Sequence, residues 1–200
     1  MTLENHDLLP DPLAQARRWY EEAVAAGLDL PEAMTLATAD AEGRPSARTV
    51  LLKGVDERGF LFYSNYESRK GRELAANPRA ALVLHWAQDP RRQVTAAGTV
   101  ERLSREESED YFRSRPLGSR LGAWASRQSE PIPDRTALER AYADAEQRFG
   151  EDPALPPWWG GFVLVPERVE LWQNRPNRLH DRFRYLRRAD GLWSVERLAP

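Results

Sequence analysis

Cationic side chains alternate along the segment WQNRPNRLHDRFRY, residues 172–185, near the end of the chain. On an extended chain Arg178, His180 and Arg182 would share one face, because side chains repeat every second residue. Like charges on one face repel each other, which makes that face a poor candidate for a core. We predict that these side chains line a pocket for an anion or an electron-rich ring. A lone histidine in a strand is more often structural, but the flanking arginines favour a functional His180.

Basic residues also bracket apolar segments in the first half of the chain. Arg48 opens and Lys53 closes RTVLLK, and Arg69 and Lys70 begin a short helix expected at 68–77. A cation at a helix start opposes the macrodipole unless an anion shares the free amides there. We predict a phosphate site, with two solvated side chains as the alternative. Arg48 and Lys53 are expected on opposite faces of their strand, where they would serve different ligands.

A third set of polar side chains lies in YFRSRPLGS, residues 111–119. Tyr111 and Arg115 are four apart and share a face if the helix continues that far, and Ser119 lies just beyond the proline. Two hydroxyls and a guanidinium form a donor set suited to a phosphate monoester. The alternative is that Tyr111 packs, Arg115 is a surface charge and Ser119 caps a turn.

Polar residues that can recognise a flat heterocycle lie elsewhere in the chain. Gln93 and the pair Gln128-Ser129 offer amides and hydroxyls, and Trp172 is the one of seven tryptophans that we assign to ring contact. The sequence contains neither G-x-x-x-x-G-K-[ST] nor G-x-G-x-x-G. A P-loop and a Rossmann crossover are therefore not expected.

Composition narrows the class of protein. The 200 residues carry 29 Lys+Arg against 31 Asp+Glu, a formal charge of −2 that gives no general attraction to nucleic acid or anionic membranes. There is no cysteine, and the three histidines lack ligand spacing, so no metal site is expected. The first residues contain no apolar signal region, and no stretch approaches the ~18 apolar residues of a membrane span. We expect a cytoplasmic protein whose redox chemistry, if any, comes from a cofactor.

The elements that must position these residues follow from periodicity and turn signals. We expect one domain, residues 1–200, that is β-barrel-like with peripheral helices. Its parts are an N-terminal arm and helix at 1–30, a first barrel block at 31–103, a helical segment at 104–150 and C-terminal strands at 160–200. Helices are predicted at 13–27, 68–77, from 104 towards 116, and 134–149, and strands at 33–39, 47–55, 60–65, 81–86, 93–103, 161–166, 168–173, 181–188 and 191–198.

Several of these segments together resemble the pyridoxamine 5′-phosphate oxidase family from about residue 7 to residue 200. The segments are RTVLLK, FYSNYESRK, RRQV, YFRSRP followed by GAWASRQS, WGGF, WQ-x-x-x-x-RLHDR and the ending ERLAP. The resemblance implies a mainly β, FMN-binding split barrel that works as a homodimer with FMN at the interface. It also implies oxidation of pyridoxamine or pyridoxine 5′-phosphate to pyridoxal 5′-phosphate, by hydride transfer from C4′ to flavin N5, with O2 reduced to H2O2.

The resemblance also assigns residues. Arg178 is expected against the pyridine ring and His180 at its polar substituents, and whether they transfer a proton or only position the substrate stays open. Two phosphates carry roughly −1.5 to −2 each, which the five cations Arg48, Lys53, Arg69, Lys70 and Arg115 can balance without a metal. The FMN contacts implied are Arg48, Thr49, Val50, Leu51, Leu52, Lys53, Tyr63, Ser64, Arg69, Lys70, Gln93, Gln128, Ser129, Trp172 and Arg182. The substrate contacts implied are Lys53, Tyr111, Arg115, Ser119, Arg178, Leu179 and His180.

The chain departs from the family pattern at two places. Many members begin with an arm containing Arg-Arg-Asp that folds over the substrate, whereas here no arginine precedes Arg17. Asn174 stands where a glycine commonly follows the WQ pair. Two alternatives to the oxidase remain: a split-barrel flavin oxidase of secondary metabolism, which should lack the Lys53, Tyr111, Arg115 and Ser119 phosphate set, and a non-catalytic carrier of flavin or pyridoxal phosphate.

Overall fold

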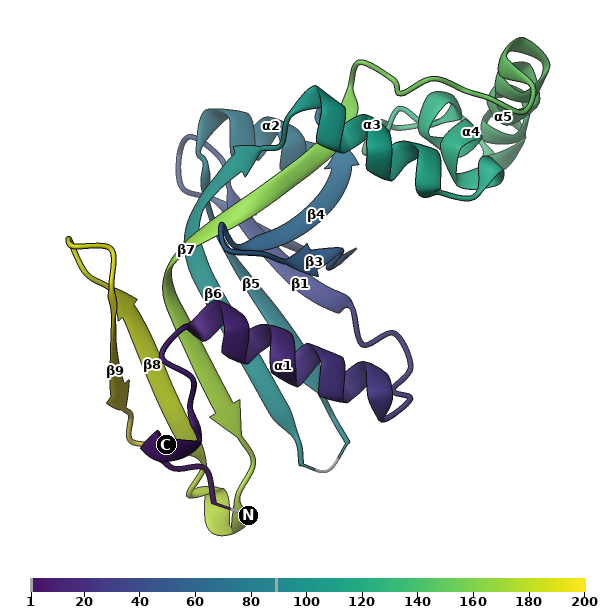
Figure 1. The fold of residues 1–200 in the computed structure, drawn as a ribbon. Coiled ribbons are helices and arrows are strands. Elements are labelled where there is room, and N and C mark those ends of the chain that lie inside the picture. The colour runs from purple at the N-terminus through teal and green to yellow at the C-terminus, as the bar shows by residue number, and fades with distance from the viewer. Residues whose placement is uncertain (1, 89) are drawn as a thin grey trace.

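The computed structural model describes residues 2–88 and 90–200, and its main element is an antiparallel sheet that curls into a half-barrel (Figure 1). The strand order is β2-β1-β5-β6-β7-β4-β3, and β8 pairs with both β7 and β9. This mainly β arrangement with peripheral helices confirms the expected fold class. The strands are β1 (Ala33–Ala39), β2 (Pro45–Leu51), β3 (Gly54–Val55), β4 (Phe60–Asn65), β5 (Arg79–Trp86), β6 (Arg92–Arg102), β7 (Trp159–Gln173), β8 (Asp181–Arg187) and β9 (Trp193–Arg197).

The long strand β7 connects three parts of the sheet. It pairs with β6 over most of its length, while its first part also pairs with β4 and its last part with β8. The prediction of two strands here, at 161–166 and 168–173, was wrong, because the chain continues through Pro166 as one bent strand. The pairing shifts register opposite Pro166, between Ala97 and Gly98. An added Cβ on Gly98 would lie 2.0 Å from the Val165 carbonyl oxygen, so this close approach requires glycine.

Helix α1 (Pro12–Ala25) begins at the N-cap Asp11 and crosses one face of the sheet (Figure 1). Its apolar side, which includes Trp19, is buried in the main core together with Phe60 and Phe62. The helix confirms the prediction at 13–27 to within two residues at its end. Because α1 covers the core side, the chemistry-bearing residues of β2 and β4 are left for the other helices to enclose.

Three further helices close the end of the sheet where those residues lie. Helix α2 (Arg69–Ala76) has Ser68 as its N-cap, and α3 (Arg105–Ser114) starts with the predicted capping box. Helix α4 (Leu117–Ala125) was not predicted. The expected helical pairing of Tyr111 with Arg115 was wrong, because α3 ends at Ser114 and Arg115 is extended before the proline.

The remaining elements are α5 (Arg135–Phe149), which packs on α4, and the short 3₁₀ turns η1 (Asn5–Asp7) and η2 (Pro176–Arg178). Helix α5 confirms the prediction at 134–149 and begins at the N-cap Asp134. Within residues 2–88 and 90–200, no helix combines the length and hydropathy needed to cross a bilayer.

Candidate functional site

A polar cleft of about 440 Å³ opens beside β2 and β4, between α2 and the junction of α3 with α4. Most of its lining had been assigned from motifs or family resemblance, and it includes every proposed phosphate-binding residue except Arg69. Pro116 and Trp159 are the lining residues that the sequence analysis did not assign. The lining residues are Arg48, Thr49, Val50, Leu51, Lys53, Tyr63, Ser64, Lys70, Tyr111, Arg115, Pro116, Ser119, Gln128 and Trp159.

Lys70 is a buried cation at the base of this cleft. Its side chain donates to Gln128 Oε1 at 2.6 Å, to Ser64 Oγ at 3.1 Å and to Ser68 Oγ at 3.3 Å, and the residue is only 8% exposed. No carboxylate in the described part of the chain forms an ion pair with it. Burial, with repulsion from Arg48, lowers the pKa of the Lys70 ammonium to about 8. A lysine held this way is arranged to receive an anion from the cleft.

Arg115 is a second cation without a carboxylate partner among the described residues. Its guanidinium lies 4.6 Å from the centre of the Trp159 ring, and its buried Nη1 has no hydrogen-bond partner. Burial lowers the pKa of Arg115. A buried, unsatisfied guanidinium nitrogen is costly unless a ligand completes its hydrogen bonds. The cleft therefore offers unpaired positive charge at two places.

Arg48 is held by a buried carboxylate that the sequence analysis missed. Glu73, 6% exposed, accepts from Thr38 Oγ1 at 2.5 Å and Ser46 Oγ at 2.6 Å, and pairs with Arg48 at 3.1 Å and with Arg69 at 2.9 Å. Burial alone would raise the pKa of Glu73, but these hydrogen bonds lower it to about 2. The spacing of Glu73 four residues after Arg69 was the available signal.

The expectation that Arg48 and Lys53 face opposite sides of one strand was wrong. The strand predicted at 47–55 is interrupted, because β2 ends at Leu51 and β3 begins only at Gly54. Leu52 turns into the core and is 1% exposed, while its N–H donates to the Glu32 carbonyl oxygen. This break brings Arg48 and Lys53 to the same cleft.

Aromatic rings form one wall of the cleft. Tyr63 stacks on Tyr111 with ring centroids 3.8 Å apart and on Trp159 at 5.7 Å. Burial raises the pKa of Tyr63 to about 12, so it remains a neutral phenol at physiological pH. Gly161 makes room for this wall, since a Cβ there would lie 2.8 Å from Tyr63 Cε1. The wall offers flat apolar surface beside the cations.

The remaining cationic cluster does not line this cleft. Arg178 lies in η2 with a φ of 62°, so the predicted extended run with Arg182 was wrong. Strand β8 begins only at Asp181, and Arg182 pairs with Glu170 and donates to the Ala199 carbonyl oxygen. Helices α3 to α5 and the β8–β9 pair lie at opposite ends of the molecule in Figure 1.

The other residues assigned from sequence also lie outside the cleft lining. His180 packs on Trp172 with centroids 4.7 Å apart, and Gln93 is the register partner of Trp172 across β6 and β7. The remaining predicted residues outside the cleft lining are Leu52, Arg69, Ser129 and Leu179. The side chain of Arg69 is 63% exposed, and Leu179 is 68% exposed.

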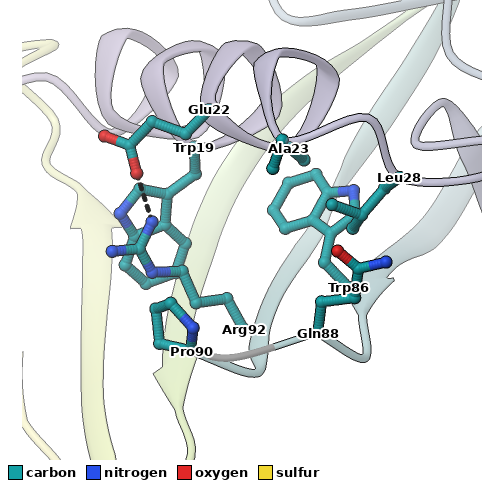
Figure 2. A pocket seen from close by; sticks show the side chains of 9 residues that line it. Trp19, Glu22, Ala23, Leu28, Trp86, Gln88, Pro90 and Arg92 are labelled. Atoms are coloured by element: carbon teal, nitrogen blue, oxygen red, sulfur yellow. Dashed lines mark hydrogen bonds and ion pairs between the residues drawn. The ribbon is translucent and has the colours of Figure 1, made fainter.

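A separate hollow lies between α1 and the β5–β6 hairpin (Figure 2). Trp19 and Trp86 flank it, and the Arg92 guanidinium lies over the Trp19 ring while pairing with Glu22. None of the assigned site residues lines this hollow. Within the described residues no group of three or more His, Asp or Glu is placed to hold a metal ion.

Comparison with known proteins adds independent evidence. The family model described as pyridoxamine 5′-phosphate oxidase matches residues 20–149. A second model, described as the pyridoxine 5′-phosphate oxidase C-terminal dimerisation region, matches residues 159–200. A pyridoxine/pyridoxamine 5′-phosphate oxidase of Cupriavidus necator is 56% identical over 100% of this chain and 93% of its own. One of Ralstonia pickettii is 57% identical with the same coverage.

Solved structures agree on the fold. PhzG of Burkholderia lata, in complex with tetrahydrophenazine-1-carboxylic acid, superposes with a TM-score of 0.93 at 31% identity, covering 100% of this chain and 98% of PhzG. A pyridoxamine 5′-phosphate oxidase-related, FMN-binding protein of Nostoc punctiforme has a TM-score of 0.78 at 21% identity, covering 96% and 100% of the two chains. The second likeness shows the shared split barrel alone.

Proposed function

This chain belongs to the pyridoxamine 5′-phosphate oxidase family, and from that premise we propose that it oxidises pyridoxamine or pyridoxine 5′-phosphate to pyridoxal 5′-phosphate. Its cofactor in this proposal is FMN, and O2 is the final acceptor, giving H2O2. With pyridoxamine 5′-phosphate the resulting imine is hydrolysed by water, and the amine leaves as ammonia. The observation that carries the proposal is a pair of cations, the buried Lys70 and the half-buried Arg115, that share one cleft without carboxylate partners among the described residues. Two separate unpaired charges suit two phosphorylated ligands better than one.

The residues at the α2 end of the cleft fit the phosphate of FMN. Lys70 supplies a charge, and Ser64 and Gln128 supply polar atoms that already contact it. Arg48 adds a guanidinium held in place by Glu73. When bound, FMN supplies the N5 atom that accepts the hydride from substrate C4′ and the reduced ring that O2 reoxidises. The protein's part in this proposal is to bind the ring rigidly and exclude water.

The residues at the α3–α4 end of the cleft fit the phosphate of the substrate. Lys53, Tyr111, Arg115 and Ser119 all line the same space, and together they offer two cations and two hydroxyls. Arg115 Nη1, which has no hydrogen-bond partner, can donate to a phosphate oxygen. Holding the phosphate here fixes one end of the substrate, which leaves its ring to be placed by other residues.

We propose that those other residues come from a second copy of the chain in a homodimer. Five residues are assigned to the site by family resemblance, yet none of them lines the cleft of its own chain: Gln93, Trp172, Arg178, His180 and Arg182. All but Gln93 belong to the segment that matches the dimerisation model. In this arrangement Arg178 holds the pyridine ring and His180 contacts its polar substituents, which completes the site across the interface.

A second candidate is an oxidase of the PhzG type, because PhzG superposes closely on this chain. The molecule bound in that solved complex is tetrahydrophenazine-1-carboxylic acid, which has no phosphate. The retained set of Lys53, Tyr111, Arg115 and Ser119 favours a phosphorylated substrate instead. A carrier without turnover is the third possibility, and the experiments below separate all three.

The primary test is a visible spectrum of the purified protein, followed by oxygen consumption with each of the two phosphorylated vitamers. We expect the spectrum to show flavin absorbance. We also expect the amounts of O2 consumed, H2O2 formed and pyridoxal 5′-phosphate formed to be equal. Flavin absorbance without turnover of either vitamer would favour a carrier. Turnover of a dihydrophenazine carboxylate but of neither vitamer would favour the PhzG-type oxidase.

The dimer is tested by mixing two variants that are each expected to be strongly impaired, Arg115→Ala and His180→Ala. If one site uses Arg115 from one chain and His180 from the other, each heterodimer retains one intact site. After subunit exchange about half of the dimers are mixed, and each mixed dimer has one intact site out of two. The mixture should therefore reach about a quarter of the wild-type activity. A mixture as inactive as its components would contradict the shared site.

A further inference from the structure

We propose that Asp181 is a positioning residue, which ties the N-terminal segment 2–9 behind the loop 174–180 and so presents the Nε2–H of His180 as a fixed hydrogen-bond donor. The inference rests on the proposed function for its consequence, because that function places His180 at the substrate ring. Its structural core, however, concerns only this chain and is tested without substrate.

The tautomer of His180 is set by the backbone. The Arg175 N–H donates to His180 Nδ1 at 3.1 Å. A backbone amide can only donate, so Nδ1 must be an unprotonated acceptor, and the neutral ring carries its proton on Nε2. The ring is also packed on Trp172. His180 therefore has one polar atom left for a ligand, and that atom is a donor.

The loop that carries this amide needs support from outside itself. Asn177 has a φ of 59° and Arg178 a φ of 62°, two consecutive non-glycine residues in the left-handed region. Such conformations persist where surrounding contacts impose them. The loop spans only the gap between the ends of β7 and β8, where Gln173 and Asp181 are register partners. The contacts of Asp181 are thus placed to decide the loop's conformation.

Asp181 is a buried carboxylate with partners on three sides. It is 4% exposed and accepts from the Leu3 N–H at 3.1 Å and from Arg197 Nη1 at 3.1 Å, and it lies 3.6 Å from Arg175 Nε. A buried carboxylate requires this degree of pairing, so removing its charge should release its partners. One of them, Arg175, carries the amide that fixes His180.

The N-terminal residues 2–4 bind the two arginine partners of Asp181, Arg175 and Arg197, and we call this set of contacts the clamp. Thr2 Oγ1 accepts from Arg175 Nη2 at 2.8 Å, and the Leu3 carbonyl oxygen accepts from Arg197 at 2.9 Å. Glu4 pairs with Arg197 at 2.8 Å. Residues 2–4 therefore contact Asp181 of the RLHDR segment and the two arginines that flank it, all in the same chain. Because these bonds meet at Asp181 and its two arginines, their loss should be cooperative.

The test is Asp181→Asn, which keeps the shape and removes the charge, with Asp190→Asn as a matched control. Asp190 lies in the β8–β9 turn, where its carboxylate forms an exposed pair with Arg188. The readout is the ¹⁵N NMR spectrum of the histidine rings in the flavin-loaded protein. The signals are assigned with His6→Gln and His85→Gln, which remove the two other histidines.

We expect wild type and Asp190→Asn to show a single Nε2–H tautomer for His180, and Asp181→Asn to show exchange between both tautomers. Flavin content should stay unchanged, and kcat/KM for the vitamer that proves to be a substrate should fall about tenfold. Arg197→Gln, which loosens the same clamp from its exposed side, should give a smaller effect in the same direction. A single Nε2–H tautomer in folded Asp181→Asn, or a mixture already in wild type, would overturn the proposal whatever the turnover. Failure of wild type to oxidise either vitamer would instead count against the proposed function alone.

Discussion

Two arginines in this chain lie over tryptophan rings at the same distance, but only one of them forms an ion pair with a carboxylate of the described residues. The Arg92 guanidinium lies 4.6 Å from the centre of the Trp19 ring, and that of Arg115 lies 4.6 Å from the centre of the Trp159 ring. Arg92 is paired with Glu22 (Figure 2), whereas Arg115 has no carboxylate partner among the described residues and one unsatisfied nitrogen.

The difference separates a packing arginine from a binding arginine. A cation–π contact of this kind contributes about 0.5 to 2 kcal/mol in either place. Only at Arg115 is the charge left for something outside the chain to neutralise. Lys70 has the same character, because its three partners are hydroxyl or amide oxygens. In this molecule the hollow with balanced charge belongs to the fold, and the cleft with unbalanced charge is the candidate site.

The largest effect is expected from Lys70→Met. Removing the buried ammonium should weaken FMN binding at least about 300-fold, roughly 3.4 kcal/mol, because a charge-assisted phosphate contact is lost in a buried site. The dissociation constant is measured by flavin fluorescence titration of the apoprotein. Arg92→Met is the control, and its affinity for FMN should match wild type. Equal FMN affinities of Lys70→Met and Arg92→Met would contradict the assignment of the cleft, and not the hollow beside Trp19, as the binding site.

The pH dependence of the same lysine should be visible in the apoprotein. Lys70 has a folded-state pKa of about 8 against an ordinary value of 10.5, so between these values the unfolded chain binds more protons than the folded one. The free energy of unfolding should therefore rise with pH from about 8 to 10.5, by about 2 kcal/mol. Urea unfolding of wild type and Lys70→Met, both free of FMN, measures the difference. A difference between them that does not change over this range would contradict an unpaired Lys70.

Arg115→Met should affect the substrate rather than the flavin. The methionine keeps contact with Trp159 but removes the donor meant for the substrate phosphate, and kcat/KM should fall about 20-fold, roughly 1.8 kcal/mol. Flavin content should remain complete, and the apoprotein should be no less stable than wild type, because a desolvated charge has been removed. Steady-state oxygen uptake and thermal unfolding give the two values. Loss of flavin together with activity would place Arg115 in the cofactor site instead.

These outcomes also mark what sequence could predict. The positions of α1, α2 and the capping box of α3 followed from local signals, and so did the lysines and arginines of the cleft lining. Family resemblance alone assigned Thr49, Val50, Leu51, Tyr63 and Ser64. The break after Leu51 was missed, since RTVLLK reads as one uninterrupted strand. In the structure Leu52 is buried, and Arg48 and Lys53 on either side of it both line the cleft.

Long-range pairing was the other limit. Glu73 gave a helical signal towards Arg69, but its hydrogen bonds to Thr38 and Ser46 depend on how α2 packs against β1 and β2. Beside Arg178, with its φ of 62°, Asp181 accepts a hydrogen bond from the Leu3 N–H, 178 residues away in the chain. No local pattern contains such a contact, so the expected common face of the RLHDR cations could not be tested from sequence.

The smallest effect is expected where charge is already balanced. Glu22→Gln removes the partner of Arg92, whose side chain is 21% exposed while that of Glu22 is 50% exposed. Exposed pairs of this kind contribute about 0 to 1 kcal/mol, so the free energy of unfolding should fall by no more than that, with FMN affinity unchanged. Urea unfolding and flavin titration measure both quantities. If Glu22→Gln created a new site for phosphate or another anion beside Trp19, unbalanced charge over a ring would be sufficient for binding. If it did not, the hydroxyl donors and depth of the Arg115 cleft would be needed as well.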